Sequence, residues 1–434
     1  MSLPAKEPSQ PDVLVVGGGP AGSTAATFLA KAGRHVVMLE KEAHPRFHIG
    51  ESLLPRNLDI FERLGVLDHV RGIGVHKPGA EFVSDRTGRS CSFPFAHALN
   101  RDRTHAWQVK RAELDALLFT NAVRHGVDGI QETRVTDIRL GTAGERSVVV
   151  ARDATGETLE WRPRYVLDAS GRDTFMATRM KVKISNKYNN TAAIYAHFMG
   201  VARREGDLDG YISIHLVEDG WFWLIPLPGD VMSIGFVGNQ SAWKGRTGTP
   251  HDLLMSRIAS SPSVSARTQK AERISDIHST GNYSYRARQG HGEGFLMIGD
   301  AYGFVDPMFS TGVLMAMTAG ELGAQTADAW LHDPRLGQKW AAYTNRELAR
   351  AMDRISWLIY RINDPVMRSL FMAPKNTLWM RDGIINMLAG NLRGNLRSML
   401  PILIFKAVFH TVSALHRRGL GPVMPEMAPE PSRG

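Results

Sequence analysis

Hydrophobic positions near the N-terminus predict a strand, a helix and a second strand in close succession. Residues 13–16 and 36–39 are short apolar runs rich in valine, as expected of buried strands. Between them, residues 21–32 predict a helix. The chain therefore begins with a strand–helix–strand unit.

Further along the chain, regions of predicted helix alternate with regions of predicted strand. Apolar side chains at helical spacing predict helices within residues 55–70 and 112–125, whereas residues 145–169 alternate like strands. Strand-like runs are densest in residues 190–288, which predicts an antiparallel sheet. The chain thus leaves its first unit and returns to it, with a short strand at 295–298, a helix at 311–331 and only helices beyond 333.

Glycines occupy the junction between the first strand and the first helix. Gly17 permits a tight turn, Gly19 lets the backbone approach a pyrophosphate, and Gly22 lets the helix pack on the sheet. The helix would direct its free N–H groups and positive dipole end at that phosphate. Glu40 ends the second strand, near the position expected of the carboxylate that holds an adenosine ribose. These features together predict a dinucleotide site.

Length and composition fit a large globular protein. The chain has 434 residues, which favours two or three domains or subdomains, and it is 43% hydrophobic and 22% charged. A single cysteine, Cys91, excludes an internal disulfide framework and favours a reducing, cytoplasmic location. The first ten residues have no apolar signal core and predict a flexible leader.

The net charge of +9 would favour binding to an acidic partner such as a nucleic acid or an anionic membrane. No zinc-ligand spacing or aromatic RNA-binding signature accompanies the basic residues, so neither a metal site nor a nucleic-acid partner is predicted. Attraction to an acidic partner or an anionic membrane, and an ordinary solvated basic surface, remain alternatives. A local basic excess lies near the C-terminus, at Arg393, Arg397, Lys406, Arg417 and Arg418.

Three further motifs indicate which dinucleotide is bound. Gln108 and Arg111 place an amide and a guanidinium at the entrance of a helix. Residues 166–172 read as a strand that ends in a turn of small residues, which allows close backbone approach. Asp300 follows a strand and a glycine at a helix start, a position suited to a ribityl hydroxyl. Over residues 10–330 this combination resembles the superfamily of FAD-containing aromatic hydroxylases.

That resemblance implies an α/β fold in which a Rossmann-like FAD-binding domain is interleaved with an antiparallel β-sheet substrate domain, followed by a helical C-terminal region. The implied FAD-binding residues are Gly17, Gly19, Pro20, Ala21, Gly22, Glu40, Lys41, Arg46, Ser52, Gln108, Arg111, Asp300 and Gly312. The implied division is a leader (1–10), FAD-binding segments (11–80, 108–185 and 289–332), substrate-domain segments (81–107 and 186–288), a helical region (333–420) and a disordered tail (421–434).

Two more motifs resemble the flavin-dependent halogenases, particularly the branch that acts on phenols, pyrroles and carrier-bound substrates. One is Trp-x-Trp-x-Ile-Pro, made of Trp221, Trp223, Ile225 and Pro226; the other is Lys77 before Pro-Gly-Ala, downstream of a Gly-Glu-Ser segment. In that family, flavin hydroperoxide oxidises chloride or bromide to hypohalous acid, which travels through a tunnel to the lysine. The tryptophan strand then forms the tunnel wall. The alternative for Lys77 is that it is an exposed loop lysine without a catalytic role. The alternative for the two tryptophans is that they only pack in the core.

The family resemblance also implies a halide site at the start of a helix, at Thr311 and Gly312. A turn that only packs on the flavin is the alternative. Tryptophan halogenases carry a catalytic glutamate where this chain has Phe309, which argues against free tryptophan as the substrate. A phenol would need a base to remove its proton, and three histidines are available without a reason to choose one: His48, His76 and His105.

No segment resembles a nicotinamide domain, so a separate flavin reductase is expected to supply reduced FAD to the halogenase. Residues 399–415 are apolar, flanked by arginines and too short to span a bilayer. They could lie peripherally on the inner face of a membrane, cover the substrate mouth or pack on the core. The rival functions are an aromatic hydroxylase, a lipid double-bond reductase of the geranylgeranyl reductase type, and a non-enzymatic flavoprotein.

Overall fold

The computed structural model describes residues 9–420 except 100, 143, 187–190, 244–247, 282–283, 363, 374–375 and 392–395. Most of the predicted leader, the predicted tail at 421–434 and the basic residue Arg393 lie outside the described residues. Ser9, inside the predicted leader, forms a parallel bridge with Trp161.

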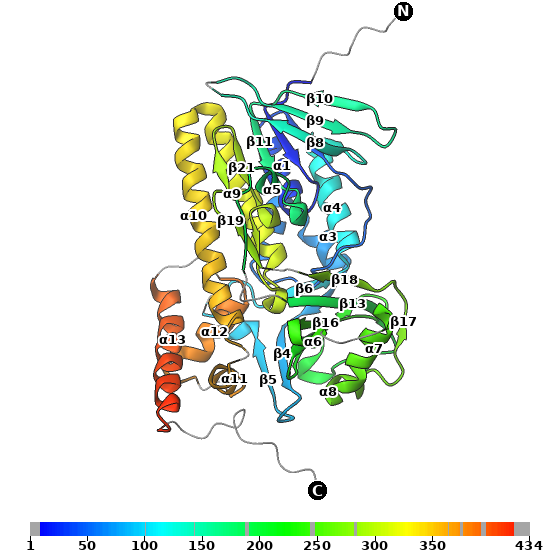
Figure 1. The fold of residues 1–434 in the computed structure, drawn as a ribbon, viewed down its shortest axis with the longest axis vertical. Coiled ribbons are helices and arrows are strands. Elements are labelled where there is room, and N and C mark those ends of the chain that lie inside the picture. The colour runs from blue at the N-terminus through cyan, green and yellow to red at the C-terminus, as the bar shows by residue number, and fades with distance from the viewer. Residues whose placement is uncertain are drawn as a thin grey trace, which may run out of the picture.

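A six-stranded sheet forms the centre of the upper part of the molecule in Figure 1. Its strand order is β20-β21-β11-β1-β2-β7, and every neighbouring pair is parallel except β20 with β21. Strands β1, β2 and β11 are buried along their whole length, as expected of a parallel sheet that is covered on both faces. The strands are β1 (Val13–Val16), β2 (Val36–Leu39), β7 (Asp128–Ile130), β11 (Tyr165–Asp168), β20 (His291–Gly292) and β21 (Phe295–Met297).

The helices around this sheet come from distant parts of the chain. Helix α1 (Pro20–Lys31) packs against both α9 (Gly312–His332) and α4 (Arg111–Arg124). The helix predicted within residues 55–70 is two helices, α2 (Asn57–Leu64) and α3 (Leu67–Gly72), because Gly65 adopts a left-handed conformation that ends the first.

Two small sheets and a two-stranded ribbon complete this half. The antiparallel sheet of β8 (Arg134–Arg139), β9 (Val148–Arg152) and β10 (Thr158–Trp161) lies at the N-terminal end of the molecule (Figure 1). The ribbon pairs β3 (Gly74–Lys77) with β6 (Ala106–Val109). The remaining elements are β12 (Lys183–Ser185), β19 (Tyr285–Ala287) and β22 (Gly303–Phe304), which pair with one another, and α5 (Phe175–Arg179).

An eight-stranded sheet forms the other half, in the order β17-β13-β16-β15-β14-β4-β5 with β18 beside β13. The strands within residues 190–288 pair antiparallel, as predicted, whereas β4, which comes from an earlier passage of the chain, pairs in parallel with β14. Its strands are β4 (Gly79–Ser84), β5 (Ser90–Pro94), β13 (Thr191–Met199), β14 (Ile212–Leu216), β15 (Gly220–Leu227), β16 (Val231–Asn239), β17 (Glu272–Arg273) and β18 (His278–Gly281).

Alternate residues of these strands face opposite layers. Phe222 and Leu224 of β15 belong to a buried cluster with helix residues such as Leu254 and Val264. Those helices, which the strand-rich sequence pattern did not predict, are α6 (Gln240–Trp243), α7 (Pro250–Ser260) and α8 (Pro262–Ser265). The other set of alternate residues faces the half of the molecule that contains the six-stranded sheet.

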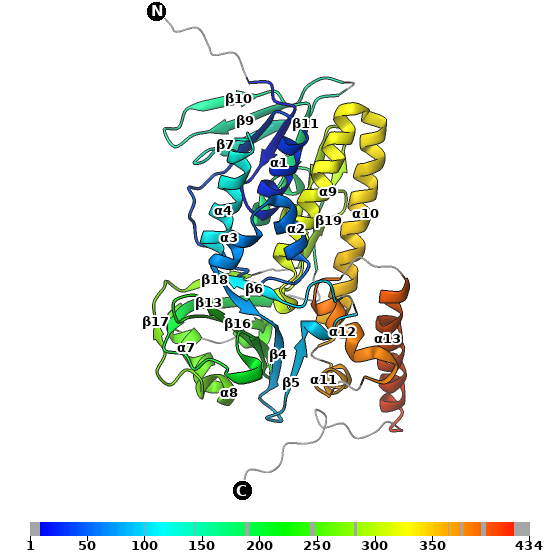
Figure 2. The ribbon, with the colours of Figure 1, turned by 180° about the vertical axis from the view of Figure 1, so that it is seen from behind.

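The C-terminal region is helical, as expected: α10 (Pro334–Ile359), α11 (Pro365–Met372), α12 (Met380–Leu388) and α13 (Leu396–Arg417). Figure 2 shows α13 at the edge of the molecule beside α12. Helix α13 buries Phe405 and Phe409, whose rings contact Trp357, and leaves Leu400 and Leu403 half exposed. One face therefore packs on the core. Among the described residues, no helix combines the length and the apolar character that crossing a membrane requires.

Candidate active site

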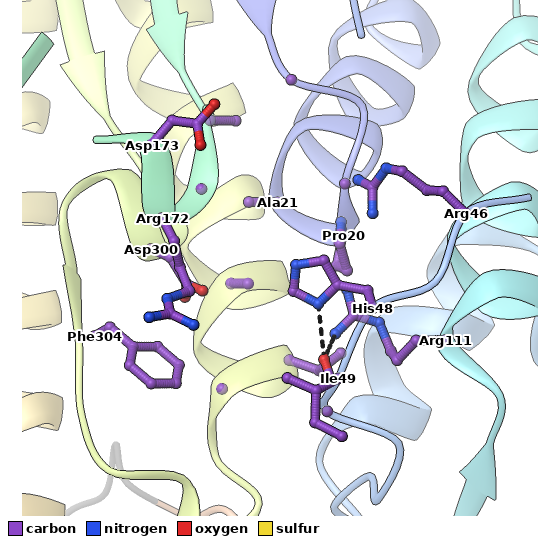
Figure 3. A pocket seen from close by; sticks show the side chains of 18 of the residues that line it. Pro20, Ala21, Arg46, His48, Ile49, Arg111, Arg172, Asp173, Asp300 and Phe304 are labelled. Carbon is purple, nitrogen blue, oxygen red and sulfur yellow. Dashed lines mark hydrogen bonds between the residues drawn. The ribbon is translucent and has the colours of Figure 1, made fainter. Parts of the chain in front are cut away.

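A cleft of about 400 Å³ lies between the six-stranded sheet and the eight-stranded sheet (Figure 3). The turn between β1 and α1 lines one part of it, together with residues 46–52 and 169–173. The start of α9 and the residues of β14 and β15 that point away from α7 line the rest. The interleaved chain path brings these segments together.

Two of the three predicted glycines serve close packing, and the third leaves open space. A Cβ atom on Gly17 would lie 2.3 Å from the carbonyl oxygen of Ala169, and one on Gly22 would lie 1.9 Å from that of Gly17. Gly17 also has a φ of 101°, which favours glycine. A Cβ on Gly19 would meet nothing closer than the Arg46 guanidinium at 3.7 Å. The space over Gly19 is therefore free for a phosphate, while Gly22 itself does not line the cleft.

Acidic and basic side chains surround the far side of this turn. Glu40 is buried, and its Oε2 accepts a hydrogen bond of 2.8 Å from the backbone N–H of Gly18. Arg46 Nη2 lies 3.5 Å from the same oxygen. Lys41 pairs with Asp173 across the cleft at 2.6 Å. Glu40, Lys41 and Arg46 all line the cleft, as predicted for cofactor contacts.

Arg111 organises the middle of the cleft. Its guanidinium binds the Asp115 carboxylate through two hydrogen bonds of 2.8 and 2.9 Å and donates a third, of 2.6 Å, to the carbonyl oxygen of Ile49. Burial alone would raise the pKa of Asp115, but Arg111 holds it below its ordinary value. Burial, reinforced by Arg111, lowers the pKa of His48 to about 4. His48, which Figure 3 shows beside Ile49 and Arg111, is therefore a weak base at neutral pH.

Asp300 lies opposite Arg111, three residues after the end of β21 (Figure 3). Burial raises the pKa of its carboxyl to about 6, although Arg111 and Arg172 oppose the rise. Figure 3 shows the Arg172 side chain between Asp300 and Phe304, and its guanidinium carbon lies 5.9 Å from the centroid of the Phe304 ring. A buried carboxyl of this kind is suited to accept a hydrogen bond from a ligand hydroxyl.

The two predicted halide residues face different spaces. Gly312 begins α9 and lines the cleft, whereas Thr311 is buried and lines only a small second cavity that Gly312 and Asp300 share. Phe309 packs against Phe82 and Phe371, with ring centroids 6.1 Å from each. Phe309 is thus part of an aromatic core.

The tryptophan strand forms a wall of the cleft. Trp221, Trp223 and Ile225 line the cleft from one face of β15, while Pro226 points away from it. The Trp223 indole N–H donates a hydrogen bond of 3.1 Å to Ser233 Oγ. A Cβ on Gly235, in the neighbouring strand, would lie 2.1 Å from the Trp223 ring. A glycine is therefore required for this indole to lie flat on the sheet.

Lys77 is a buried residue and not an exposed loop lysine. Its side chain is 1% exposed, and Nζ donates a hydrogen bond of 2.8 Å to the carbonyl oxygen of Leu53. Nζ also lies 5.2 Å from the centroid of the Phe95 ring. Burial lowers the pKa of Lys77 to about 7. Lys77 does not line the cleft. It lies behind the lining residue Ser52, through its hydrogen bond to the neighbouring Leu53, and its strand β3 contacts the tryptophan strand β15.

Ser52 and Gln108 meet at an isolated bridge but face different surroundings. Ser52 lines the cleft, and no described residue forms a hydrogen bond with its buried hydroxyl. Gln108 lies outside the cleft lining, and its Nε2 donates a hydrogen bond of 2.7 Å to the carbonyl oxygen of Gly210. In this structure the side chain of Gln108 connects β6 to the segment before β14.

Sequence reasoning missed an acid–histidine pair at the same wall. His197 Nε2 of β13 lies 2.9 Å from Oε1 of Glu51, which lines the cleft. Glu51 had a local signal, the Gly-Glu-Ser segment, but His197 had none. The candidate bases His76 and His105 instead form an aromatic cluster with Trp107 and do not line the cleft.

The residues of the cleft fit FAD. A glycine turn with open space over Gly19, a carboxylate at the end of β2 and a buried carboxyl at Asp300 lie along one elongated cavity. The orphaned hydroxyl of Ser52 adds a further hydrogen-bonding group to that surface. No group of three or more side chains that could hold a metal ion occurs among the described residues.

Comparison with known proteins agrees with this geometry. Residues 10–323 match the family described as FAD binding domain. The chain is 35% identical over 369 residues to a flavin-dependent halogenase of Armillaria mellea, covering 76% of this chain and 69% of that one. It is 30% identical over 380 residues to a 1H-pyrrole-2-carbonyl-(peptidyl-carrier protein) brominase of Pseudoalteromonas luteoviolacea, covering 82% and 89%.

The chain is also 34% identical over 323 residues to the tryptophan 2-halogenase of Chondromyces crocatus; the match covers 73% of this chain and 61% of that relative's length. Among solved structures, a flavoprotein/dehydrogenase of Cytophaga hutchinsonii superposes with a TM-score of 0.85 at 28% identity, covering 95% of this chain and all of that one. The myxobacterial chondrochloren halogenase superposes with a TM-score of 0.77 at 26% identity, covering 97% and 95%.

Proposed function

Because the chain belongs to the flavin-dependent halogenases, a family with an FAD-binding domain, we propose that it halogenates an electron-rich aromatic substrate. When bound in its reduced form, FAD would react with molecular oxygen and so supply the chemistry that oxidises chloride or bromide to hypohalous acid. The observation that carries this proposal is Lys77, a buried amine with a pKa lowered to about 7 that lies behind the wall of the FAD cleft.

In this proposal the chain holds FAD along the cleft in a fixed order. Gly17 and Gly19 surround the pyrophosphate, and Glu40 accepts hydrogen bonds from the adenosine ribose. Asp300 accepts a hydrogen bond from the ribityl chain. The N-terminus of α9, at Gly312, points its free N–H groups at the halide.

Lys77 would receive the halogen. A neutral amine can react with hypohalous acid to form a haloamine and water, or can hold the acid by a hydrogen bond. Because burial lowers the pKa of Lys77 to about 7, a large share of the amine is neutral near pH 7. An ordinary lysine would be protonated almost completely at that pH and could not accept the halogen.

The tryptophan wall would keep substrate and flavin apart. Trp221, Trp223 and Ile225 close the cleft on the side of the eight-stranded sheet, and Lys77 lies outside the cleft. A substrate beside Lys77 would therefore meet hypohalous acid but not the flavin. This separation favours halogenation over direct hydroxylation.

The proposed substrate is a phenol or pyrrole, free or bound to a carrier protein. Phe309, packed in an aromatic core, leaves no carboxylate at the position used by tryptophan halogenases. The similarity to a brominase of a carrier-bound pyrrole supports a carrier-bound substrate. Because the chain is also similar to a tryptophan 2-halogenase, tryptophan is included among the substrates to be tested. A separate flavin reductase and a peripheral membrane contact through residues 399–415 remain predictions.

Mass spectrometry of products tests this proposal. Phenol, pyrrole and tryptophan substrates, free and carrier-loaded, are incubated with FAD, a flavin reductase, oxygen and either halide. Lys77→Ala should abolish a halide-dependent mass gain while FAD stays bound, whereas Lys339→Ala, at an exposed lysine, should not change it. An oxygen mass gain that ignores halide would identify a hydroxylase. Product formed only from lipids without oxygen would identify a double-bond reductase.

A further inference from the structure

The buried pair of Glu51 and His197 has no role in the function proposed so far. Glu51 is 1% exposed and lines the cleft, and its Oε1 lies 2.9 Å from His197 Nε2. No group in the described part of the chain forms a hydrogen bond with its other oxygen, Oε2, which is also buried. A purely structural ion pair would normally have both carboxylate oxygens satisfied. The free oxygen therefore points to a group that is supplied from the cleft.

Other contacts hold the two side chains in place. The backbone oxygen of Glu51 accepts a 2.8 Å hydrogen bond from Val109, and the backbone N–H of His197 donates one of 2.9 Å to Ser275. The Phe47 ring lies over His197, with ring centroids 5.5 Å apart. The His197 side chain is 13% exposed, against 1% for Glu51. Solvent therefore reaches the histidine, whereas the carboxylate faces the cleft.

Halide oxidation in this enzyme class requires a proton. Reduced FAD, oxygen, one halide ion and one proton give FAD, hypohalous acid and water, so the overall balance includes a proton that the flavin does not supply. With FAD filling the cleft, that proton would reach the reacting atoms most directly through a side chain that lines the cleft. Hypohalous acid and the aromatic substrate then give product and water without further net proton exchange.

We propose that Glu51 and His197 form the path that delivers this proton from solvent to the flavin side of the cleft. Glu51 releases a proton from Oε2 into the cleft and takes one at Oε1 from His197 Nε2. His197 then takes a proton at Nδ1 from a solvent water, which leaves as hydroxide and accounts for the proton that the overall reaction consumes. Rotation of the carboxyl group and of the imidazole ring returns the pair to its starting state. This inference rests on the proposed function and assigns two residues to its first step.

Several charged or titratable groups face the pair and would affect its protonation. Arg111, from α4, interacts electrostatically with Glu51, as does Tyr195, which lies two residues before His197 on the same face of β13. Arg172 interacts with Tyr195, and the His278 ring of β18 lies 5.7 Å from the ring of Tyr195. These groups are unchanged in the variants of the pair, so a difference between the variants and the wild type reports on Glu51 and His197 themselves.

The test measures how much reduced flavin is converted to halogenated product and how much to hydrogen peroxide. Glu51→Gln and His197→Gly should each lower product formation about tenfold or more, with a matching rise in peroxide. Added imidazole should restore His197→Gly but not Glu51→Gln. His251→Gln, at an exposed histidine of α7 outside the cleft lining, is the matched control. FAD affinity, measured by fluorescence, should change less than twofold in all three variants.

A second readout needs no bound FAD. In the FAD-free protein, the nitrogen NMR signal of His197 Nε2 should have a different chemical shift in Glu51→Gln than in the wild type, because the variant lacks the carboxylate oxygen that lies 2.9 Å from this nitrogen. If the wild type halogenates and both variants keep its ratio of product to peroxide, or if imidazole does not restore His197→Gly, the proton path is refuted and the halogenase function stands. If the wild type forms no halogenated product, both are refuted.

Discussion

Replacing Lys77 by methionine should change the pH dependence of folding stability as well as activity. Burial lowers the pKa of Lys77 from its ordinary 10.5 to about 7. Between these two values the unfolded chain binds a proton that the folded chain does not, so the free energy of unfolding of the wild type rises with pH. Below pH 7 both states hold the proton, and the cost of burying the charge is present in full.

The size of the effect follows from the two pKa values. Each unit of pKa difference corresponds to about 1.4 kcal/mol, so the cost is on the order of 5 kcal/mol at pH 7 and below, and it vanishes above pH 10.5. Lys77→Met removes this cost but also the hydrogen bond to Leu53, which is worth about 1 to 2 kcal/mol. The variant should therefore be more stable than the wild type at pH 7 by roughly 3 kcal/mol, with no halogenation activity.

Equilibrium urea unfolding at pH 6, 7, 8, 9 and 10 measures this difference directly. The stability advantage of the variant over the wild type should fall by about 3 to 4 kcal/mol from pH 7 to pH 10, so that the two proteins are about equally stable at pH 10. The exposed control Lys339→Met should follow the wild-type curve at every pH, within about 0.5 kcal/mol. A gap for Lys77→Met that stays constant with pH would refute the argument that this amine is buried and largely neutral.

Three other perturbations test the cofactor cleft. Gly22→Ala should destabilise the fold by more than about 2 kcal/mol, because its Cβ would lie 1.9 Å from Gly17, whereas Gly19→Ala should fold normally and lose FAD affinity; equal thermal midpoints for the two would contradict this. Burial raises the pKa of Asp300 to about 6, so the wild type loses stability as the pH rises from 4 to 6. Asp300→Asn should therefore raise the free energy of unfolding of the FAD-free protein by up to about 3 kcal/mol at pH 7 and leave it unchanged at pH 4, as calorimetry at both pH values can measure. Trp223→Ala should leave a cavity that costs about 3 to 5 kcal/mol and increase peroxide release at the expense of product, and unchanged coupling would remove the wall from the mechanism.

The cofactor unit could be predicted from the sequence because its requirements are local. A buried strand, a glycine turn, a helix and a terminal carboxylate follow one another within residues 13–40, and each is set by backbone geometry over a few residues. The same holds for β15, where the period of two puts Trp221, Trp223 and Ile225 on one face. Membership of the halogenase family, confirmed by comparison, likewise rested on short motifs.

Details of the candidate site depended on side-chain direction, which short motifs do not specify. Pro226 belongs to the tryptophan motif but points away from the cleft, and Thr311 faces a separate cavity although Gly312 lines the cleft. Gln108 forms a hydrogen bond with Gly210, far away in the sequence. Neighbours along a strand or turn point to different sides, so a motif includes residues that do not share one surface.

The sequence by itself determined the nucleotide-binding unit, the alternation of strand and helix regions, and the family. Only the tertiary structure decided that Lys77 is buried behind Leu53, that helices α6 to α8 cover one face of the large sheet, and that Glu51 meets His197. The physical reason is that burial and pairing arise where distant chain passages cross. The pairing of β13 with β16 and of β4 with β14 brings those passages to the cleft, and no local pattern of residues encodes where they meet.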